Sequence, residues 1–112
     1  MGDVTVEVGL LTAAVLVDVR AERARQEAIG LRKRALGIDW RSCADPDMAG
    51  GDGTRFLVLG EEVGEVANAV LETGSGEQGV TDAELRAELV QVAAVAIAWV
   101  EAIDVRQARE AR

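Results

Sequence analysis

The sequence predicts an all-α fold, and three observations carry this prediction. Hydrophobic residues make up 49% and charged residues 29% of the 112-residue chain, which is a globular balance. With no Tyr, one Phe and two Trp, the core must be built from Val, Leu, Ile and Ala, which suit close helix packing. Three long segments show helical spacing of their apolar residues, and we expect almost no strand. A single domain over residues 1–112 follows, with a small core that association of chains would complete.

The first predicted helix runs from about Val8 to Ile29 and can extend beyond Gly30. The alternation of valines at positions 4, 6 and 8 would also fit a short strand, but the Ala-rich continuation favours a helix. Residues 20–34 contain good helix formers with charges of both signs, so they predict a solvated helical face.

A loop over about residues 37–54 follows, because helical periodicity disappears there and the segment holds Pro46 and several glycines. The second predicted helix runs from about Arg55 to Glu72, with Thr54 as its N-cap. Its last residues lead into TGSGEQG, residues 73–79, which we expect to form a turn.

The third predicted helix begins at the sequence TDAE. Thr81 and Glu84 have the spacing of a capping box, in which each residue satisfies a backbone N–H group of the other. The helix is expected to continue to about Ala108.

Charge and composition exclude several functions. The formal net charge of −8 argues against general binding of nucleic acid and against an anionic membrane surface. With no His and one Cys (Cys43), a zinc site, a His-based catalytic triad and a disulfide within the chain are excluded. The N-terminus lacks the basic region of a signal peptide, and the apolar run from Leu89 to Val100 is too short to span a bilayer. We therefore expect a cytoplasmic protein.

Residues 59–72, LGEEVGEVANAVLE, place glutamates inside an apolar helical run. On a helical wheel, Glu62 and Glu65 project together beside a stripe that is expected to be buried. That stripe consists of Leu59, Val63, Val66 and Val70. Taken alone, the glutamates would also fit a solvated helix flank.

Glu88 in the third helix changes this interpretation. Between residues 88 and 100 only Glu88 and Gln91 are polar, and Glu88 lies on the same face as Val92 and Val95. A buried carboxylate is costly unless it is compensated, although a Glu near a helix start can also reach solvent. If the second and third helices pack antiparallel, the carboxylates can converge. Such a group of oxygen ligands predicts a Mg²⁺ site, with Mn²⁺ as a substitute.

EExxE on one helix and ExxD on the next resemble the signature of MazG-like nucleoside triphosphate pyrophosphohydrolases. The first motif is complete in EEVGE, residues 61–65, whereas ELVQ, residues 88–91, has Gln91 where the family usually has Asp. The resemblance covers about residues 55–105. It implies a four-helix-type bundle formed as a homodimer or homotetramer. The implied reaction is Mg²⁺-dependent hydrolysis of a nucleoside triphosphate to the monophosphate and pyrophosphate, including house-cleaning of modified nucleotides.

The resemblance also implies roles for individual residues. Glu62, Glu65 and Glu88 would hold the metal with Gln91 at the fourth position, and Glu61 and Glu62 would be catalytic. Arg106 and Arg109 are candidates to bind phosphates, although two arginines at a helix end also fit complementation of the helix dipole. Trp40 could stack on a base or could anchor the loop on the bundle.

A second hypothesis has a different functional class. Because Gln91 brings no charge to the metal site, the chain could be a catalytically weak or inactive helical module that binds a nucleotide or a protein. A phosphatase with a similar carboxylate cluster is a third hypothesis, which differs in releasing phosphate.

Overall fold

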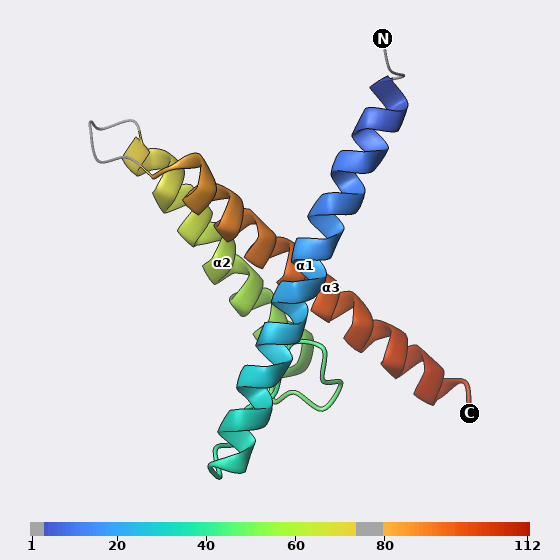
Figure 1. Ribbon diagram of the computed structural model, residues 1–112. Helices are drawn as coiled ribbons and strands as arrows, with labels where there is room; N and C mark the ends of the chain where they lie inside the picture. The colour runs from blue at the N-terminus through green and yellow to red at the C-terminus, as the bar shows by residue number, and fades with distance from the viewer. Residues whose placement is uncertain (1–3, 74–79) are drawn as a thin grey trace.

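The computed structural model describes residues 4–73 and 80–112, and it consists of three α-helices (Figure 1). Helix α1 spans Val4–Ala35, α2 spans Gly51–Thr73 and α3 spans Asp82–Glu110. No strand occurs among the described residues. The all-α class and the three helices are therefore confirmed.

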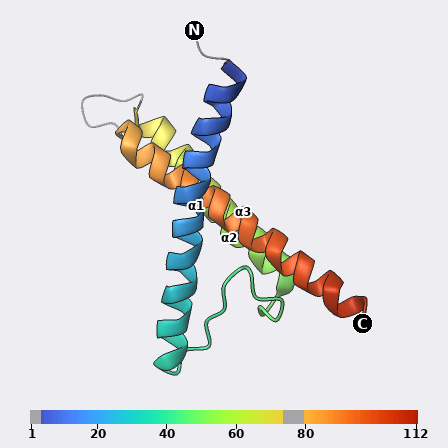
Figure 2. The ribbon, with the colours of Figure 1, turned by 45° about the vertical axis from the view of Figure 1, so that its right-hand side comes forward.

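Helices α2 and α3 lie side by side and run in opposite directions, and α1 crosses them at a steep angle (Figures 1 and 2). Helix α3 is the central element, because it packs against both α1 and α2. Both views show the N-terminal half of α1 extending well beyond this crossing. The long connection between α1 and α2 returns from the end of α1 toward the crossing (Figures 1 and 2).

Small side chains on α3 form the centre of the core. Ala94, Ala98 and Ala102 are buried and follow each other at intervals of four residues, which puts them on one face of the helix. Their size lets neighbouring elements approach closely. Val95 and Ala98 pack with Cys43 of the loop, so the loop belongs to the core.

Helix α1 begins at Val4, before its predicted start at about Val8, and it continues through Gly30 to Ala35, the extension that the sequence allowed. The ring of Trp40 lies directly on the Gly30 backbone, and a Cβ atom at position 30 would stand 2.3 Å from Trp40 Cζ3. The helix ends in a Schellman motif: Gly37, at φ 83°, donates to the carbonyl of Arg34, and Ile38 donates to that of Lys33. Trp40 is thus an anchor of the loop on α1.

This close approach makes Gly30→Ala a sharp test of the Trp40 position. The added methyl group must displace the indole ring, so we expect a shift in tryptophan emission and a loss of about 1–3 kcal/mol in the free energy of unfolding. The matched control is Gly64→Ala, where an added Cβ meets nothing within 4 Å. Because Ala is the better helix former, that control should gain up to about 1 kcal/mol. Equal behaviour of the two variants in urea denaturation would contradict the packing of Trp40 on Gly30.

The predicted start of the second helix was wrong. Helix α2 begins at Gly51, so Thr54 lies inside the helix and is not its N-cap, and the loop is shorter than residues 37–54. Asp52, in the additional first turn, accepts hydrogen bonds from Arg55 and from Trp99 of α3. These contacts hold the extra turn, and the sequence pattern of α2 alone does not reveal them.

The predicted start of the third helix is confirmed. Thr81 is the N-cap of α3, and its hydroxyl oxygen accepts a hydrogen bond of 3.1 Å from the backbone N–H of Glu84. The helix continues to Glu110, two residues beyond the predicted end. Most of the turn predicted over residues 73–79 lies outside the described residues. Within the described ranges, no helix has the length and apolar character that a bilayer span requires.

The apolar stripe predicted for α2 is only partly buried. Leu59 and Val66 are half-buried, whereas Val63 and Val70 are exposed. Helix α2 is rotated relative to the wheel-based prediction, so that Glu62 is half-buried at the contact with α3. This rotation brings the carboxylates toward Glu88 and leaves apolar side chains of α2 at the surface.

Candidate metal centre and the adjoining cavity

Glu62 and Glu65 of α2 and Glu88 of α3 form one carboxylate cluster. One carboxylate oxygen from each residue lies within 4.8 Å of the others. The antiparallel arrangement of α2 and α3 produces this cluster, because it places the middle of α2 opposite the first turns of α3. Glu62 and Glu88 are half-buried and Glu65 is exposed, so the cluster opens to solvent on one side.

The cluster brings several negative charges together. Among the described residues, the Oε2 atoms of Glu62 and Glu88 are buried and have no hydrogen-bond partner. Burial raises the pKa of Glu62 above its ordinary value, and the neighbouring charges of Glu65, Glu88 and Glu61 raise it further. Burial also raises the pKa of Glu88, with the carboxyl group of Glu65 as the second cause. Because the native state disfavours the charges here, a bound cation would relieve the cluster.

A cavity of about 180 Å³ adjoins the cluster at Glu62. Helix α1, the loop and both other helices contribute to its walls. Its lining residues are Glu22, Arg25, Gln26, Trp40, Ser42, Cys43, Val58, Glu62, Gln91 and Val95. The structure therefore places Gln91 and Trp40, two of the residues singled out from the sequence, in one cavity with Glu62. Glu61 is exposed on α2, next to the cluster in sequence.

Glu22 and Arg25 are cavity residues to which the sequence assigned no role. The guanidinium of Arg25 donates hydrogen bonds to both carboxylate oxygens of Glu22, one turn earlier in α1. These bonds and the charge of Glu22 raise the pKa of Arg25, and the charge of Glu62 adds to this effect. Their i,i+3 spacing was the available signal, but it occurs in many solvated helices. Only the crossing of α1 over α3 shows that Arg25 shares a cavity with Glu62.

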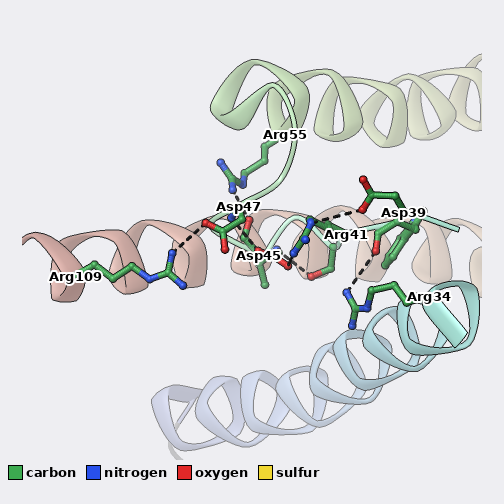
Figure 3. Close-up of polar contacts among 10 residues, drawn as sticks. Arg34, Asp39, Arg41, Asp45, Asp47, Arg55 and Arg109 are labelled. Atoms are coloured by element: carbon green, nitrogen blue, oxygen red, sulfur yellow. Dashed lines mark hydrogen bonds and ion pairs between the residues drawn. The ribbon is translucent and has the colours of Figure 1, made fainter. Parts of the chain in front are cut away.

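The loop wall of the cavity is held by a buried arginine. The Arg55 side chain, from α2, donates to the carbonyl oxygens of Cys43 and Asp45 at 2.8 and 2.6 Å and forms an ion pair with Asp52. Only 1% of Arg55 is exposed. Figure 3 shows how it lies between α2 and the loop. A guanidinium has donors for all three partners, so one residue connects the loop to the start of α2.

Further polar contacts hold the loop, two of them to α1 and α3. Arg109 of α3 pairs with Asp47, Arg41 pairs with Asp45 inside the loop, and Arg34 of α1 donates to the carbonyl oxygen of Trp40 (Figure 3). These contacts surround the Arg55 contacts and keep the loop against the helices.

Arg106 and Arg109 are distant from the carboxylate cluster within this chain. Eighteen residues separate Arg106 from Glu88, which is about 27 Å along a helix. Arg106 pairs with Asp52, and the hydrogen bond from Trp99 together with Arg106 lowers the pKa of Asp52. In the described structure these two arginines therefore act as partners of the loop and of the α2 start.

Comparison of the chain with protein-family models, curated proteins and solved structures gives no match. The resemblance to MazG-like enzymes therefore stays a prediction that rests on the residues of the two motifs.

Proposed function

We propose that this chain is a Mg²⁺-dependent nucleoside triphosphate pyrophosphohydrolase that releases the monophosphate and pyrophosphate. The observation that carries the proposal is the convergence of Glu62, Glu65 and Glu88 beside a cavity that also contains an aromatic ring and a guanidinium. Each group suits one part of a nucleoside triphosphate. The carboxylates can hold a metal ion for the phosphates, the guanidinium can bind phosphate oxygens, and the aromatic ring can stack on the base.

The donor set fits Mg²⁺. Opposite ligands of an octahedral Mg²⁺ stand about 4.2 Å apart, so oxygens that already lie within 4.8 Å need only small rotations to meet one ion. The unpartnered oxygens of Glu62 and Glu88 supply the lone pairs. When bound, the metal ion neutralises phosphate oxygens and acidifies a water molecule. Mn²⁺ takes the same kind of ligands.

The other residues have distinct roles in this proposal. Glu61, next to Glu62 on α2, would orient the attacking water, and Glu62 would accept its proton as well as hold the metal. Gln91 completes the ligand set with an amide oxygen. Arg25 binds phosphate oxygens from the α1 side and stays in place through its bonds to Glu22.

Trp40 supplies the surface for the base. Its ring is fixed on Gly30 and also lines the cavity, so loop anchoring and base stacking are compatible roles for one side chain. We further propose that the chain works as a homodimer or homotetramer, which completes the helical bundle.

The proposal is tested by incubating the protein with ordinary and modified nucleoside triphosphates and Mg²⁺ or Mn²⁺, and by measuring pyrophosphate and phosphate separately. Pyrophosphate release that depends on the metal is the expected result. Release of phosphate alone would indicate a phosphatase instead. If no nucleotide is hydrolysed although Mg²⁺ raises the melting temperature, the site would be a binding module without catalysis.

Gln91→Asp is expected to tighten Mg²⁺ binding, because a charged oxygen replaces a neutral one at the metal. The gain should be on the order of tenfold in affinity, as is usual for groups that tune a metal site. Isothermal titration with Mg²⁺ in the absence of nucleotide measures it. Asp104→Asn, at an exposed position of α3, is the control for a change of charge. An unchanged titration curve for Gln91→Asp would remove Gln91 from the ligand set.

A further inference from the structure

The cavity beside the carboxylate cluster has a charged wall and a buried wall. Glu22, Arg25 and Glu62 belong to the charged wall. Ser42 and Val95, which are only 6% and 5% exposed, belong to the buried wall. A nucleotide in this cavity would therefore have its phosphates at the charged wall and its base against the buried wall.

Gln26 lies between the charged wall and the Trp40 ring. Glu22, Gln26 and Gly30 follow one another at intervals of four residues, so they share one face of α1. The ring of Trp40 packs on Gly30, at one end of this row. Glu22 binds Arg25 at the other end. The Gln26 amide is therefore about 6 Å along the helix from each end, which places it beside a base that stacks on the ring.

Ser42 brings a buried hydroxyl group to the same part of α1. It lines a neighbouring cavity together with Arg23 and Glu27, which lie within one turn of Gln26. The Ser42 hydroxyl oxygen accepts a hydrogen bond of 3.2 Å from the backbone N–H of Ala44. Among the described residues, the hydroxyl hydrogen has no acceptor and the Gln26 amide has no hydrogen-bond partner. A donor that is buried to this degree indicates an acceptor on a ligand.

We propose that Gln26 and Ser42 bind the edge of the base and select a pyrimidine nucleotide. Cytosine, uracil and thymine present a donor and an acceptor side by side on this edge, in one order or the other, followed by the carbonyl oxygen O2. The amide of Gln26 has both a donor and an acceptor and matches either order by rotation. The hydroxyl group of Ser42 then donates to O2.

Purines do not satisfy the same groups. At the position of O2, adenine has a C–H group and guanine has an amino group, so the buried hydroxyl hydrogen of Ser42 would stay without an acceptor. The inference rests on the proposed function, because it names the base of the same substrate.

Two measurements separate base selection from the proposed reaction. With Mg²⁺, kcat/KM for pyrophosphate release should be at least about fivefold higher for dCTP and dTTP than for dATP and dGTP. Isothermal titration with dCMP, dTMP, dAMP and dGMP should give the same order of affinities without any hydrolysis. If the monophosphates show this order and no triphosphate is hydrolysed, base selection is supported and the proposed reaction fails. Equal affinities, a preference for purines or no binding would overturn the inference, and pyrophosphate release would still support the reaction.

Variants of the two residues test their contacts with the base. Ser42→Ala should lower the affinity for dCMP at least about fivefold and leave that for dAMP unchanged, because only the pyrimidine uses the hydroxyl group. Gln26→Leu should weaken dCMP binding at least about tenfold but not the binding of deoxyribose 5-phosphate, which has no base. Gln107→Leu, at an exposed position of α3, is the matched control and should bind dCMP as the wild type does. Wild-type affinity of Gln26→Leu for dCMP, or an unchanged pyrimidine preference in Ser42→Ala, would overturn the inference.

Discussion

Glu62→Gln and Glu88→Gln are each expected to reduce metal-dependent pyrophosphate release by at least about 10²- to 10³-fold, because each removes a charged ligand from the metal. The same variants should melt at a higher temperature than the wild type without metal. In the apo protein each carboxylate has a buried oxygen without a partner among the described residues, and a neutral amide avoids the cost of a charge there. Each kcal/mol gained in the free energy of unfolding raises the melting temperature by about 4 °C.

This opposite change in activity and stability distinguishes a metal site from a structural contact. The two properties are measured by pyrophosphate assay and by calorimetry in the presence of a chelator. Asp104→Asn removes an exposed carboxylate of α3 and should change neither. Full activity of either variant would contradict the assignment of the cluster as a metal site. A lower melting temperature would show that the carboxylates have partners in the apo protein.

The pH dependence of the apo protein follows from the same carboxylates. The pKa values of Glu62 and Glu88 are raised in the folded chain, so the native state holds more protons than the unfolded state above the ordinary glutamate pKa. Their contribution to the free energy of unfolding therefore decreases as the pH rises through that window. Stability measured in urea near pH 5 should exceed that at pH 7, and excess Mg²⁺ should reduce the difference. Glu62→Gln and Glu88→Gln should reduce it as well.

Arg55→Met is expected to lower the free energy of unfolding by about 3 kcal/mol and to release the loop from α2. The substitution keeps an unbranched buried side chain but leaves the carbonyl oxygens of Cys43 and Asp45 without their donor. The loop wall of the cavity would then open. Because Cys43 is buried in the wild type, its reaction rate with a thiol reagent reports on this opening.

Arg41→Met is the matched control for the loop. Arg41 is exposed and forms ion pairs within the loop, which solvent screens and which therefore contribute little to stability. We expect normal stability and slow thiol modification for this control, and at least a tenfold faster reaction for Arg55→Met. If both variants react at the same rate, Arg55 does not hold the loop.

Much of the fold was predictable, because local signals determine it. The Thr81 cap requires only residues 81–84, and the three helices follow from periodicity and from the position of Pro46. The start of α2 was missed, because Asp52 takes its partners from Trp99 and Arg106, far away in sequence. Propensity and capping rules do not include such contacts.

For the site, too, local signals were readable from the sequence and long-range contacts were not. The carboxylate cluster was predictable, because helical spacing places Glu62 and Glu65 on one face and antiparallel packing supplies Glu88. The cavity was not predictable, because it depends on the angle at which α1 crosses α3. Arg25 enters it only through that angle, and Trp40 through the absence of a side chain at Gly30.

Because of the route of the loop, the carboxylate cluster and the closure of the cavity depend on different parts of the chain. All three carboxylates stand on helices, whereas residues 40–43 of the loop close the cavity from another direction. Arg55 holds this segment through backbone carbonyl groups of Cys43 and Asp45, which are the same whatever side chains the loop carries. The side chains of Trp40 and Cys43 also anchor the loop, on α1 and on α3, but the carbonyl contacts do not depend on the other loop side chains. New side chains at Ser42, which lines the cavity, would change what the cavity accepts and leave the Arg55 contacts and the carboxylate cluster intact.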